Sequence, residues 1–284
     1  MLRNSIQHWL AISLLFALTF AASSGCNSAT DTESSSNVAE NKPVVRLSIE
    51  ERLAQPVSEK RNEISKESLQ ISAGDNGLYT LLIPTDYEER KPLPLILYLH
   101  DGGGARGRSF PHYGATALQG LVEPALGELG AILVAPDSGP ARWDADRNQD
   151  FIATLIEHLQ KEFEIDTDRT LICGYSMGGH GAWFFAEAHE DFFRTAIPIA
   201  GGPVTDKTDW TNQFYVIHSK DDNVVPFADT ESYVKKLQES GVKVQTDYLT
   251  GYDHFQIPRY AQPLKKAVPW VKEAWLDAAS SEEK

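Results

Sequence analysis

The chain has 284 residues, which is enough for one large α/β domain or two smaller domains. Its hydrophobic content of 42% is ordinary for a globular protein, so a complete core can be buried. The formal net charge of -14 argues against a nucleic-acid partner, because nucleic-acid binding depends on Lys and Arg side chains that neutralise phosphates.

An apolar run close to the N-terminus predicts export. Trp9–Ala22 (WLAISLLFALTFAA) is continuously apolar, too short for a comfortable membrane span but suited to the core of a signal peptide. The small residues Ser23–Gly25 before Cys26 resemble the lipobox of bacterial lipoproteins, in which the cysteine becomes the lipidated first residue, although position 23 is Ser where Leu is usual. We therefore expect a lipoprotein-type signal peptide at 1–25, with plain secretion or a retained anchor as the alternatives.

A polar stretch, 26–43, is expected to form a disordered tether before a catalytic domain at 44–284, because it is acidic and has almost nothing to bury. The expected location is the periplasm or the cell surface, with the membrane contacted only through the lipid anchor; otherwise the protein is secreted. Once Cys26 is processed, Cys173 is the remaining thiol, so no internal disulfide is expected. The histidines are scattered without paired spacing, so we expect no metal and no cofactor.

The first elements of the domain are short. Glu51–Leu53 and Lys60–Ile64 are candidate helices. Leu69–Ala73 and Leu78–Ile83 are expected strands on either side of Gly74–Gly77, whose sequence GDNG is a strong hairpin-turn signal.

Five apolar runs further along the chain are too short for helices and apolar on both faces, as the strands of a covered parallel sheet are. They are Pro94–His100, Ala131–Pro136, Leu171–Gly174, Thr195–Ala200 and Gln213–His218. Amphipathic helices are expected at Phe151–Phe163 and Phe227–Leu237, a half-exposed edge strand at Val242–Leu249, and a last helix from about Pro269. Alternating strands and helices predict one α/β domain with a mostly parallel central sheet and helices on both faces.

The stretch Thr170–Ala188 contains Gly174-Tyr175-Ser176-Met177-Gly178, a match to G-x-S-x-G. In a nucleophile elbow this serine sits on a sharp strand-to-helix turn, and the N-terminus of the following helix favours a developing anion. The pattern alone also fits a glycine-rich loop with a surface serine. The apolar run before it and the small-residue helix after it favour the elbow.

Partners for Ser176 follow the next strands. Asp221 and Asp222 come after the strand that ends at His218, and His254 comes after Val242–Leu249. The chain order Ser, Asp, His is that of the α/β-hydrolases. Ser176 is expected to attack an acyl carbonyl, His254 to take its proton, and one of the two aspartates to hold the histidine in the correct tautomer.

From Tyr79 to Trp275 the sequence resembles an α/β-hydrolase of the small, lidless esterase type, as in carboxylesterase/phospholipase, feruloyl-esterase and polyhydroxybutyrate-depolymerase-like proteins. The motifs that carry the resemblance are LYLHDGGG (97–104), GYSMGG (174–179), HSKDDNVVP (218–226) and GYDHF (251–255). The resemblance implies an α/β-hydrolase fold without a cap domain and ester hydrolysis through an acyl-enzyme. It also implies Asp222 as the acid, because the family places the acid three residues before a Val-Pro pair, which leaves Asp221 as a solvated neighbour.

The oxyanion hole needs two backbone donors. One is expected to be the N–H of Met177, and the other to come from the loop after the third strand. The resemblance maps this second donor to Gly102, with Gly103 as the alternative. Asp101 stands where look-alike enzymes have glycine, which leaves the second donor open.

The segment between Ala200 and Gln213 is too short to form a cap domain, so we expect an open pocket that accepts a large or polymer-attached ester. Trp143 and Tyr175 are the candidate substrate-binding residues, and a buried loop anchor is the alternative role of Trp143. Phe110, His112 and Tyr113 are further candidates, whereas His100 and His180 are expected to be structural.

Two other functions remain open from the sequence. A serine peptidase of the same fold uses the same triad, and a lipoprotein with a relict site would bind without catalysis. The complete Ser, Asp and His set argues against the second, because binding alone does not require all three residues.

Overall fold

The computed structural model describes residues 47–58, 64–103 and 111–282. The expected signal peptide (1–25), tether (26–43), lipidation site Cys26 and candidate Phe110 lie outside the described residues, as does nearly all of the second short helix.

The described residues form one sheet in the order β1-β2-β4-β3-β5-β6-β7-β8. β1 pairs antiparallel with β2, and β2 antiparallel with β4, whereas all other neighbours are parallel. The bounds are β1 (Ser65–Ser72), β2 (Asp75–Leu82), β3 (Leu93–Leu99), β4 (Ile132–Pro136), β5 (Ile165–Tyr175), β6 (Thr195–Ile199), β7 (Gln213–Ser219) and β8 (Val244–Leu249). The mostly parallel sheet is the predicted one.

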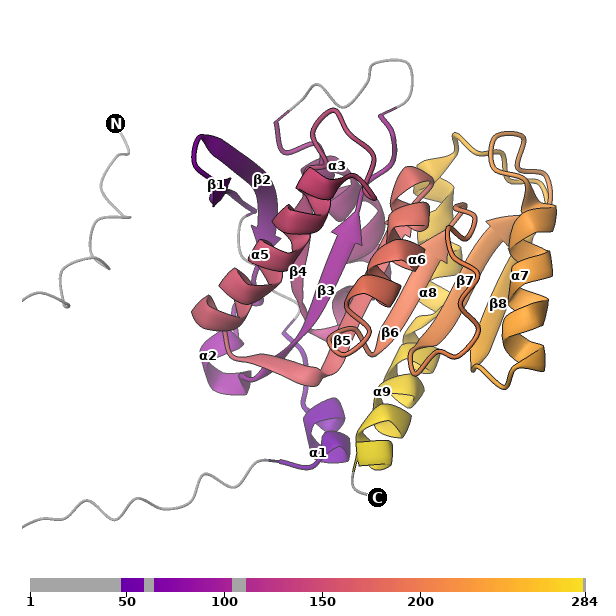
Figure 1. The fold of residues 1–284 in the computed structure, drawn as a ribbon. Helices are drawn as coiled ribbons and strands as arrows, with labels where there is room; N and C mark the ends of the chain where they lie inside the picture. The colour runs from indigo at the N-terminus through magenta and orange to yellow at the C-terminus, as the bar shows by residue number, and fades with distance from the viewer. Residues whose placement is uncertain (1–46, 59–63, 104–110, 283–284) are drawn as a thin grey trace, which may run out of the picture. The chain divides into compact units, whose positions relative to one another are not determined.

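Helices cover both faces of this sheet, as predicted. Figure 1 shows α5 and α6 in front of the strands and α8 and α9 behind them. The α-helices are α1 (Ile49–Ala54), α2 (Tyr87–Arg90), α3 (Gly114–Ala117), α4 (Glu123–Leu126), α5 (Asp146–Glu162), α6 (Met177–Ala188), α7 (Phe227–Glu239), α8 (Ala261–Lys266) and α9 (Val268–Glu282). Shorter turns of helix are η2 (Leu118–Val122), η3 (Gly127–Leu129) and η4 (Ile257–Tyr260).

Alternation along each strand divides the core between the two faces. In β3, Leu95, Leu97 and Leu99 pack with the helices of one face, and Ile96 and Tyr98 with those of the other; all five side chains are fully buried. The two-residue period of a strand produces this division, and burial on both faces explains why the strand reads as a continuous apolar run.

The helices between β3 and β4, from α3 to η3, were not predicted. Their apolar residues recur at helical spacing, as in Leu118, Leu121 and Val122 followed by Ala125 and Leu126. The signal was therefore present in the sequence. The segment covers the same face of the sheet as α8 and α9.

The first hairpin was predicted, but its turn was placed two residues too late. The chain turns at Ala73 and Gly74, whose φ is 83°, and Asp75 already begins β2. Gly77 has a different reason to be glycine: a Cβ there would lie 2.2 Å from the ring of Phe151. Close packing of α5 on the strand, and not the turn, requires the second glycine.

A buried ionic cluster joins α1 to the beginning of β5. The carboxylate of Asp166 accepts hydrogen bonds from the guanidinium groups of Arg52 and Arg169, and Arg52 also contacts Asp168 at 2.9 Å. Asp166 is completely buried, and the two arginines keep its pKa below the usual value although burial alone would raise it. The cluster fixes the first described helix to the amino end of a central strand.

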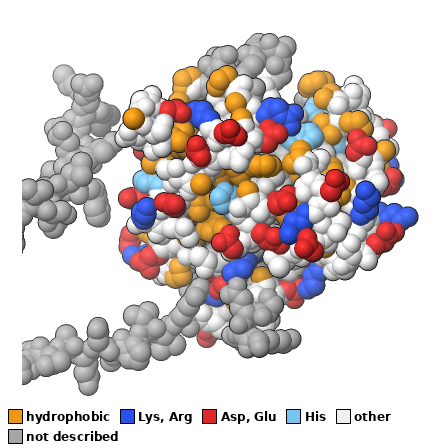
Figure 2. Space-filling view, in the orientation of Figure 1, with side chains coloured by type: hydrophobic (Ala, Val, Ile, Leu, Met, Phe, Trp, Pro, Cys, Tyr) orange, Lys and Arg blue, Asp and Glu red, His pale blue; other side chains and the backbone are white. Residues whose placement is uncertain are grey.

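The surface of one face mixes the two signs of charge. Figure 2 shows acidic and basic side chains interspersed over the side that carries α5, α6 and α7. Among the residues that the structure describes, there is no helix with the length and apolar character that a membrane crossing requires.

Candidate active site

Ser176 lies on a strained turn between β5 and α6. Its φ is 56° and its ψ is -112°, a combination that non-glycine residues rarely adopt. The turn is held by the N–H of Ser176, which donates to the carbonyl of Ile199 at 2.8 Å, and by its carbonyl, which accepts from His180 at 3.0 Å. The structure therefore has the strand–turn–helix arrangement of a nucleophile elbow.

Two glycines allow this turn. A Cβ on Gly174 would lie 2.2 Å from the carbonyl oxygen of Gly178, and a Cβ on Gly178 would lie 1.9 Å from that of Leu99. Both distances are far below van der Waals contact. The elbow packs so closely against itself and the end of β3 that neither position tolerates a side chain.

His254 connects Ser176 to Asp222. Its Nε2 lies 2.7 Å from the hydroxyl of Ser176, and its Nδ1 lies 2.8 Å from Oδ2 of Asp222. A carboxylate only accepts, so Nδ1 carries the hydrogen and Nε2 is the acceptor for the serine hydroxyl. The structure thus brings together the three residues that the sequence singles out, from the ends of β5, β7 and β8.

The carboxylate of Asp222 is fully buried and accepts four hydrogen bonds. Oδ1 accepts from the N–H groups of Val224 and Val225 at 2.9 and 2.8 Å, and Oδ2 is contacted by His254 and His218. Burial raises the pKa of Asp222, but these donors outweigh burial and hold its pKa well below the usual range. Asp222 is therefore ionised in the folded protein.

Asp221 has a structural role that differs from that of Asp222. Its exposed carboxylate accepts the N–H of Gly251 at 2.6 Å and so joins the loops that follow β7 and β8. The expectation that Asp221 is a solvated neighbour needs this addition, because its side chain holds the loop of His254 in place.

The loop after β3 is fixed by side chains on three of its residues. The N–H of Ser138 donates to Nε2 of His100, so Nδ1 carries the hydrogen and donates to the carbonyl of Asp101 at 2.7 Å. The carboxylate of Asp101 accepts from the N–H of Gly103 at 2.7 Å and from the hydroxyl of Tyr113 at 3.0 Å. Since the N–H of Gly103 is donated to Asp101, Gly102 is the better candidate for a donor to substrate.

A cavity of about 450 Å³ opens beside Ser176. Its lining residues are Asp101, Gly102, Gly103, Tyr113, Tyr175, Ser176, Val224, His254, Phe255 and Ile257. Val224, Phe255 and Ile257 were not predicted, although each lies a few residues from an assigned aspartate or histidine. Val224 and Phe255 are 50% and 69% exposed, so they present apolar surface at the cavity.

The interpretation of Trp143 as a substrate-binding residue is wrong. Its side chain is 1% exposed, its indole N–H donates to the carbonyl of His100 at 2.9 Å, and it is not among the residues that line the cavity. Gly181 of α6 lies against it, because a Cβ there would come within 2.9 Å of Trp143. Trp143 is the buried loop anchor that the sequence allowed as the alternative.

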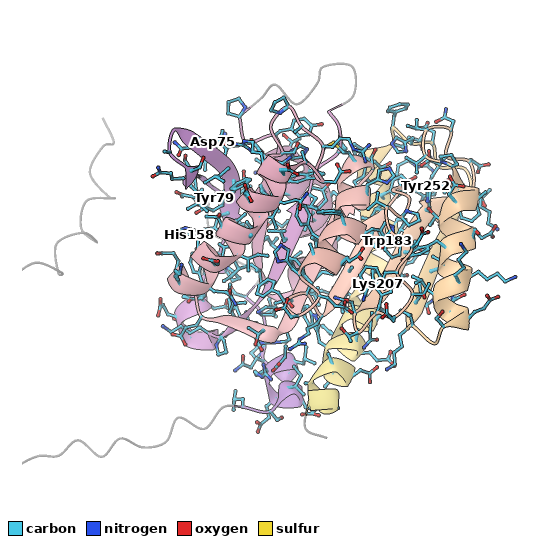
Figure 3. The ribbon with its side chains drawn as sticks, in the orientation of Figure 1. Asp75, Tyr79, His158, Trp183, Lys207 and Tyr252 are labelled. Atoms are coloured by element: carbon cyan, nitrogen blue, oxygen red, sulfur yellow. The ribbon has the colours of Figure 1, made fainter. Side chains whose placement is uncertain are left out.

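Tyr175 lines the cavity but has little exposed surface, at 1%. Its hydroxyl donates to the carbonyl of His254 at 2.7 Å, so it supports the histidine loop. A second hydrogen bond supports the loop of His254. The hydroxyl of Ser219 donates to the carbonyl of Tyr252, which is labelled in Figure 3. Of the remaining candidates, Tyr113 lines the cavity, whereas His112 contacts the carbonyl of Tyr79.

Within the described part of the chain, no group of three or more His, Cys, Asp or Glu side chains is arranged to hold a metal ion. Cys173 is a buried free thiol whose pKa is raised by burial. No cap domain is evident among the described residues: 201–212, the segment before β7, contains neither helix nor strand.

The fold and the elbow together define an α/β-hydrolase, and comparison with known proteins agrees. The dienelactone hydrolase family matches residues 140–280. A thermostable esterase of known crystal structure superposes with a TM-score of 0.63 at 24% identity, over 74% of this chain and 62% of that chain. The chain therefore has the α/β-hydrolase fold.

Curated relatives include feruloyl esterase C of Emericella nidulans, 30% identical over 158 residues that make up 52% of this chain and 56% of that protein. Dipeptidyl-peptidase 5 of Porphyromonas gingivalis is 25% identical over 148 residues, which are 48% of this chain and 21% of the peptidase. The chain spans about half the length of the feruloyl esterases it matches. The predicted feruloyl-esterase resemblance is confirmed.

Proposed function

We propose that this protein is a serine hydrolase that cleaves carboxylic esters through an acyl-enzyme. The observation that carries the proposal is the continuous hydrogen-bonded chain from Ser176 through His254 to Asp222, with its serine on a strained elbow at the mouth of a cavity. The relatives named as feruloyl esterases support an ester as substrate.

In the proposed reaction His254 takes the proton of the Ser176 hydroxyl while the serine oxygen attacks the ester carbonyl. The N–H groups of Met177 and Gly102 stabilise the oxyanion, helped by the N-terminus of α6. His254 then gives the proton to the leaving alcohol. In the second half of the reaction His254 takes a proton from the water that attacks the acyl-enzyme and returns it to the oxygen of Ser176 as the acid leaves. Asp222 keeps His254 in the tautomer that these reaction steps require, and it stabilises the histidine cation that forms.

The substrate class we propose is an ester with an apolar, aromatic acyl group on a large or polymeric alcohol. Val224 and Phe255 present exposed apolar surface at the cavity, suited to an aromatic ring. The cavity has no cap among the described residues, which suits an ester attached to a polymer. The feruloyl esterase relatives support the same class.

A peptidase is the second candidate, because one relative is named dipeptidyl-peptidase 5 and amide cleavage uses the same triad. A panel of p-nitrophenyl esters, feruloyl esters and peptide anilides separates the two. We expect hydrolysis of the esters, with feruloyl esters preferred over acetyl esters. Turnover of the anilides alone would contradict esterase function, and turnover of neither class would favour a binding role.

Tyr113 tests the assignment of the oxyanion loop. Burial and the adjacent Asp101 raise the pKa of Tyr113 to about 12, so its hydroxyl remains a donor to Asp101 at neutral pH. We expect Tyr113→Phe to lower kcat/KM about 3- to 10-fold, the loss of one ordinary hydrogen bond.

The matched control is Tyr87→Phe, which removes a hydroxyl that accepts the N–H of Glu164 at 2.8 Å, close to the beginning of β5. It should leave the rate unchanged. Steady-state kinetics on one ester measure both variants, and equal effects in the two would show that loop positioning by Tyr113 is not involved.

We also propose that the protein is an exported lipoprotein anchored at Cys26. The apolar run Trp9–Ala22 covers only part of the roughly 20 residues that a spanning helix needs, and small residues precede the cysteine. A lipid anchor followed by an acidic tether would hold the catalytic domain at a membrane.

Fractionation and mass spectrometry of the mature N-terminus test the anchor. Wild-type protein is expected in the membrane fraction, beginning at a diacylglycerol-modified Cys26, and Cys26→Ala is expected to be unprocessed or released. A wild-type protein that is released without lipid and begins near Ser23 would contradict lipidation and leave simple secretion.

A further inference from the structure

His218 is a buried histidine that the proposed reaction does not use. It lies near the carboxyl end of β7 and has no exposed surface. Its Nε2 lies 3.3 Å from Oδ2 of Asp222 and 3.2 Å from the carbonyl oxygen of Val225, and its Nδ1 lies 2.9 Å from the hydroxyl of Thr230. Every polar contact of the ring is therefore identified.

These contacts fix the tautomer of His218. Both neighbours of Nε2 are acceptors, a carbonyl and a carboxylate, so Nε2 carries the hydrogen and points it between them. In this tautomer Nδ1 accepts the hydroxyl hydrogen of Thr230, from the first turns of α7. The opposite arrangement would leave Nε2 facing two acceptors without a hydrogen.

The charged and titratable groups around His218 are few. They are Asp222 on its own loop, His254, which contacts the same carboxylate oxygen, and His180 of α6, whose pKa is lowered first by burial and in part by His218. The ring of Phe227 packs edge-on against His218 at 5.8 Å between centroids. Asp222 is thus the carboxylate that His218 contacts, and the contact is on the oxygen that faces His254.

We propose that His218 is a positioning residue that orients the carboxylate of Asp222 toward His254. The backbone N–H groups of Val224 and Val225 hold Oδ1, and Nε2 of His218 lies 3.3 Å from Oδ2, the oxygen that His254 also contacts. Three fixed donors then leave one orientation of the carboxylate, in which Oδ2 meets Nδ1 of His254. Only the kinetic test of this inference rests on the proposed function, because NMR can detect the hydrogen bond between His254 and Asp222 without turnover.

His218→Leu and His218→Gln separate hydrogen bonding from packing. Leucine fills space without a donor, whereas the glutamine amide places an N–H₂ near the position of Nε2. We expect His218→Leu to lower kcat about 10- to 100-fold with little change in KM, as for a lost hydrogen bond to a charged group. His218→Gln should recover most of this loss.

Thr230→Val is the alternative test if His218→Leu does not fold. It removes only the hydroxyl that contacts Nδ1 of His218, and we expect a smaller fall in kcat. The matched control is Thr195→Val, at an equally buried threonine whose hydroxyl donates to the carbonyl of Thr170 at 3.1 Å on a neighbouring strand. It should leave kcat unchanged.

The low-field proton NMR signal of the His254 Nδ1–H, bonded to Asp222, gives a readout that does not require turnover. It should be present in wild type and His218→Gln, and shifted or lost in His218→Leu and Thr230→Val. Equal kinetic losses in the leucine and glutamine variants, or an unchanged NMR signal in both His218→Leu and Thr230→Val, would overturn the proposal. A wild-type protein that shows the signal but hydrolyses no ester would contradict the proposed function alone.

Discussion

Replacing Ser176 by alanine is expected to abolish covalent labelling by a fluorophosphonate probe and to lower kcat by about 10⁴-fold or more. The serine oxygen is the atom that forms the acyl-enzyme. Alanine has neither this oxygen nor the hydroxyl proton that Nε2 of His254, at 2.7 Å, would take. Alanine retains the strained backbone of the elbow, so the variant should fold with a melting temperature close to wild type.

Ser232→Ala is the matched control, because it removes a hydroxyl from an exposed position of α7. It should be labelled at the wild-type rate. Gel-based labelling and steady-state kinetics on one ester measure both variants. Labelling that persists in Ser176→Ala would place the nucleophile elsewhere and contradict the proposed triad.

Asp222→Asn should lower kcat by about 10³- to 10⁴-fold. The buried carboxylate accepts hydrogen bonds on both oxygens, from His254, His218 and two backbone N–H groups. An amide offers one acceptor oxygen, and its N–H₂ would face donors wherever it points. It therefore favours the wrong tautomer of His254, with the hydrogen on Nε2, where it cannot accept the serine proton.

Asp221→Asn is the internal control one residue away. The amide oxygen of the asparagine can still accept the N–H of Gly251. We therefore expect kcat within a factor of about 3 of wild type, a smaller change than the loss of one hydrogen bond would cause. Kinetics of the two variants side by side decide between the aspartates. A large loss in Asp221→Asn together with a small one in Asp222→Asn would reverse the assignment.

The effect of Asp222→Asn on the stability of the folded protein is expected to depend on pH. Because the pKa of Asp222 is lowered on folding, its ionised form stabilises the folded state above the unfolded aspartate value of about 3.9, and this contribution is lost as the pH falls through the lower folded-state value. Asp222→Asn should therefore be less stable than wild type at neutral pH, with a difference that becomes smaller in acid. Urea unfolding at a series of pH values measures this.

The sheet and the three site residues could be predicted because each has a local signal. Covered parallel strands are short apolar runs, and the nucleophile, acid and base each stand in a motif directly after a strand. Trp143 was misread because the same exposed-loop position also suits an anchor, and only the tertiary structure shows its indole under the loop of His100.

Contacts between distant segments were beyond the sequence. Tyr113 donates to Asp101 across 12 positions, and the role of His218 depends on which nitrogen meets Asp222 and which meets Thr230. Nothing in the spacing of these residues fixes such geometry. Gly77 was read as part of a turn for the same reason, since Phe151, which lies against it, is far away in the chain.

The buried cluster of Arg52, Asp166 and Arg169 gives the domain a polarity along β5. Asp166 stands at the amino end of this strand and Ser176 directly beyond its carboxyl end, and ten residues of extended chain span about 33 Å. The first described helix is thus locked to one pole of the sheet and the reacting hydroxyl lies at the other. Substitutions in this ionic cluster are therefore expected to change the stability of the domain before they change the geometry of Ser176.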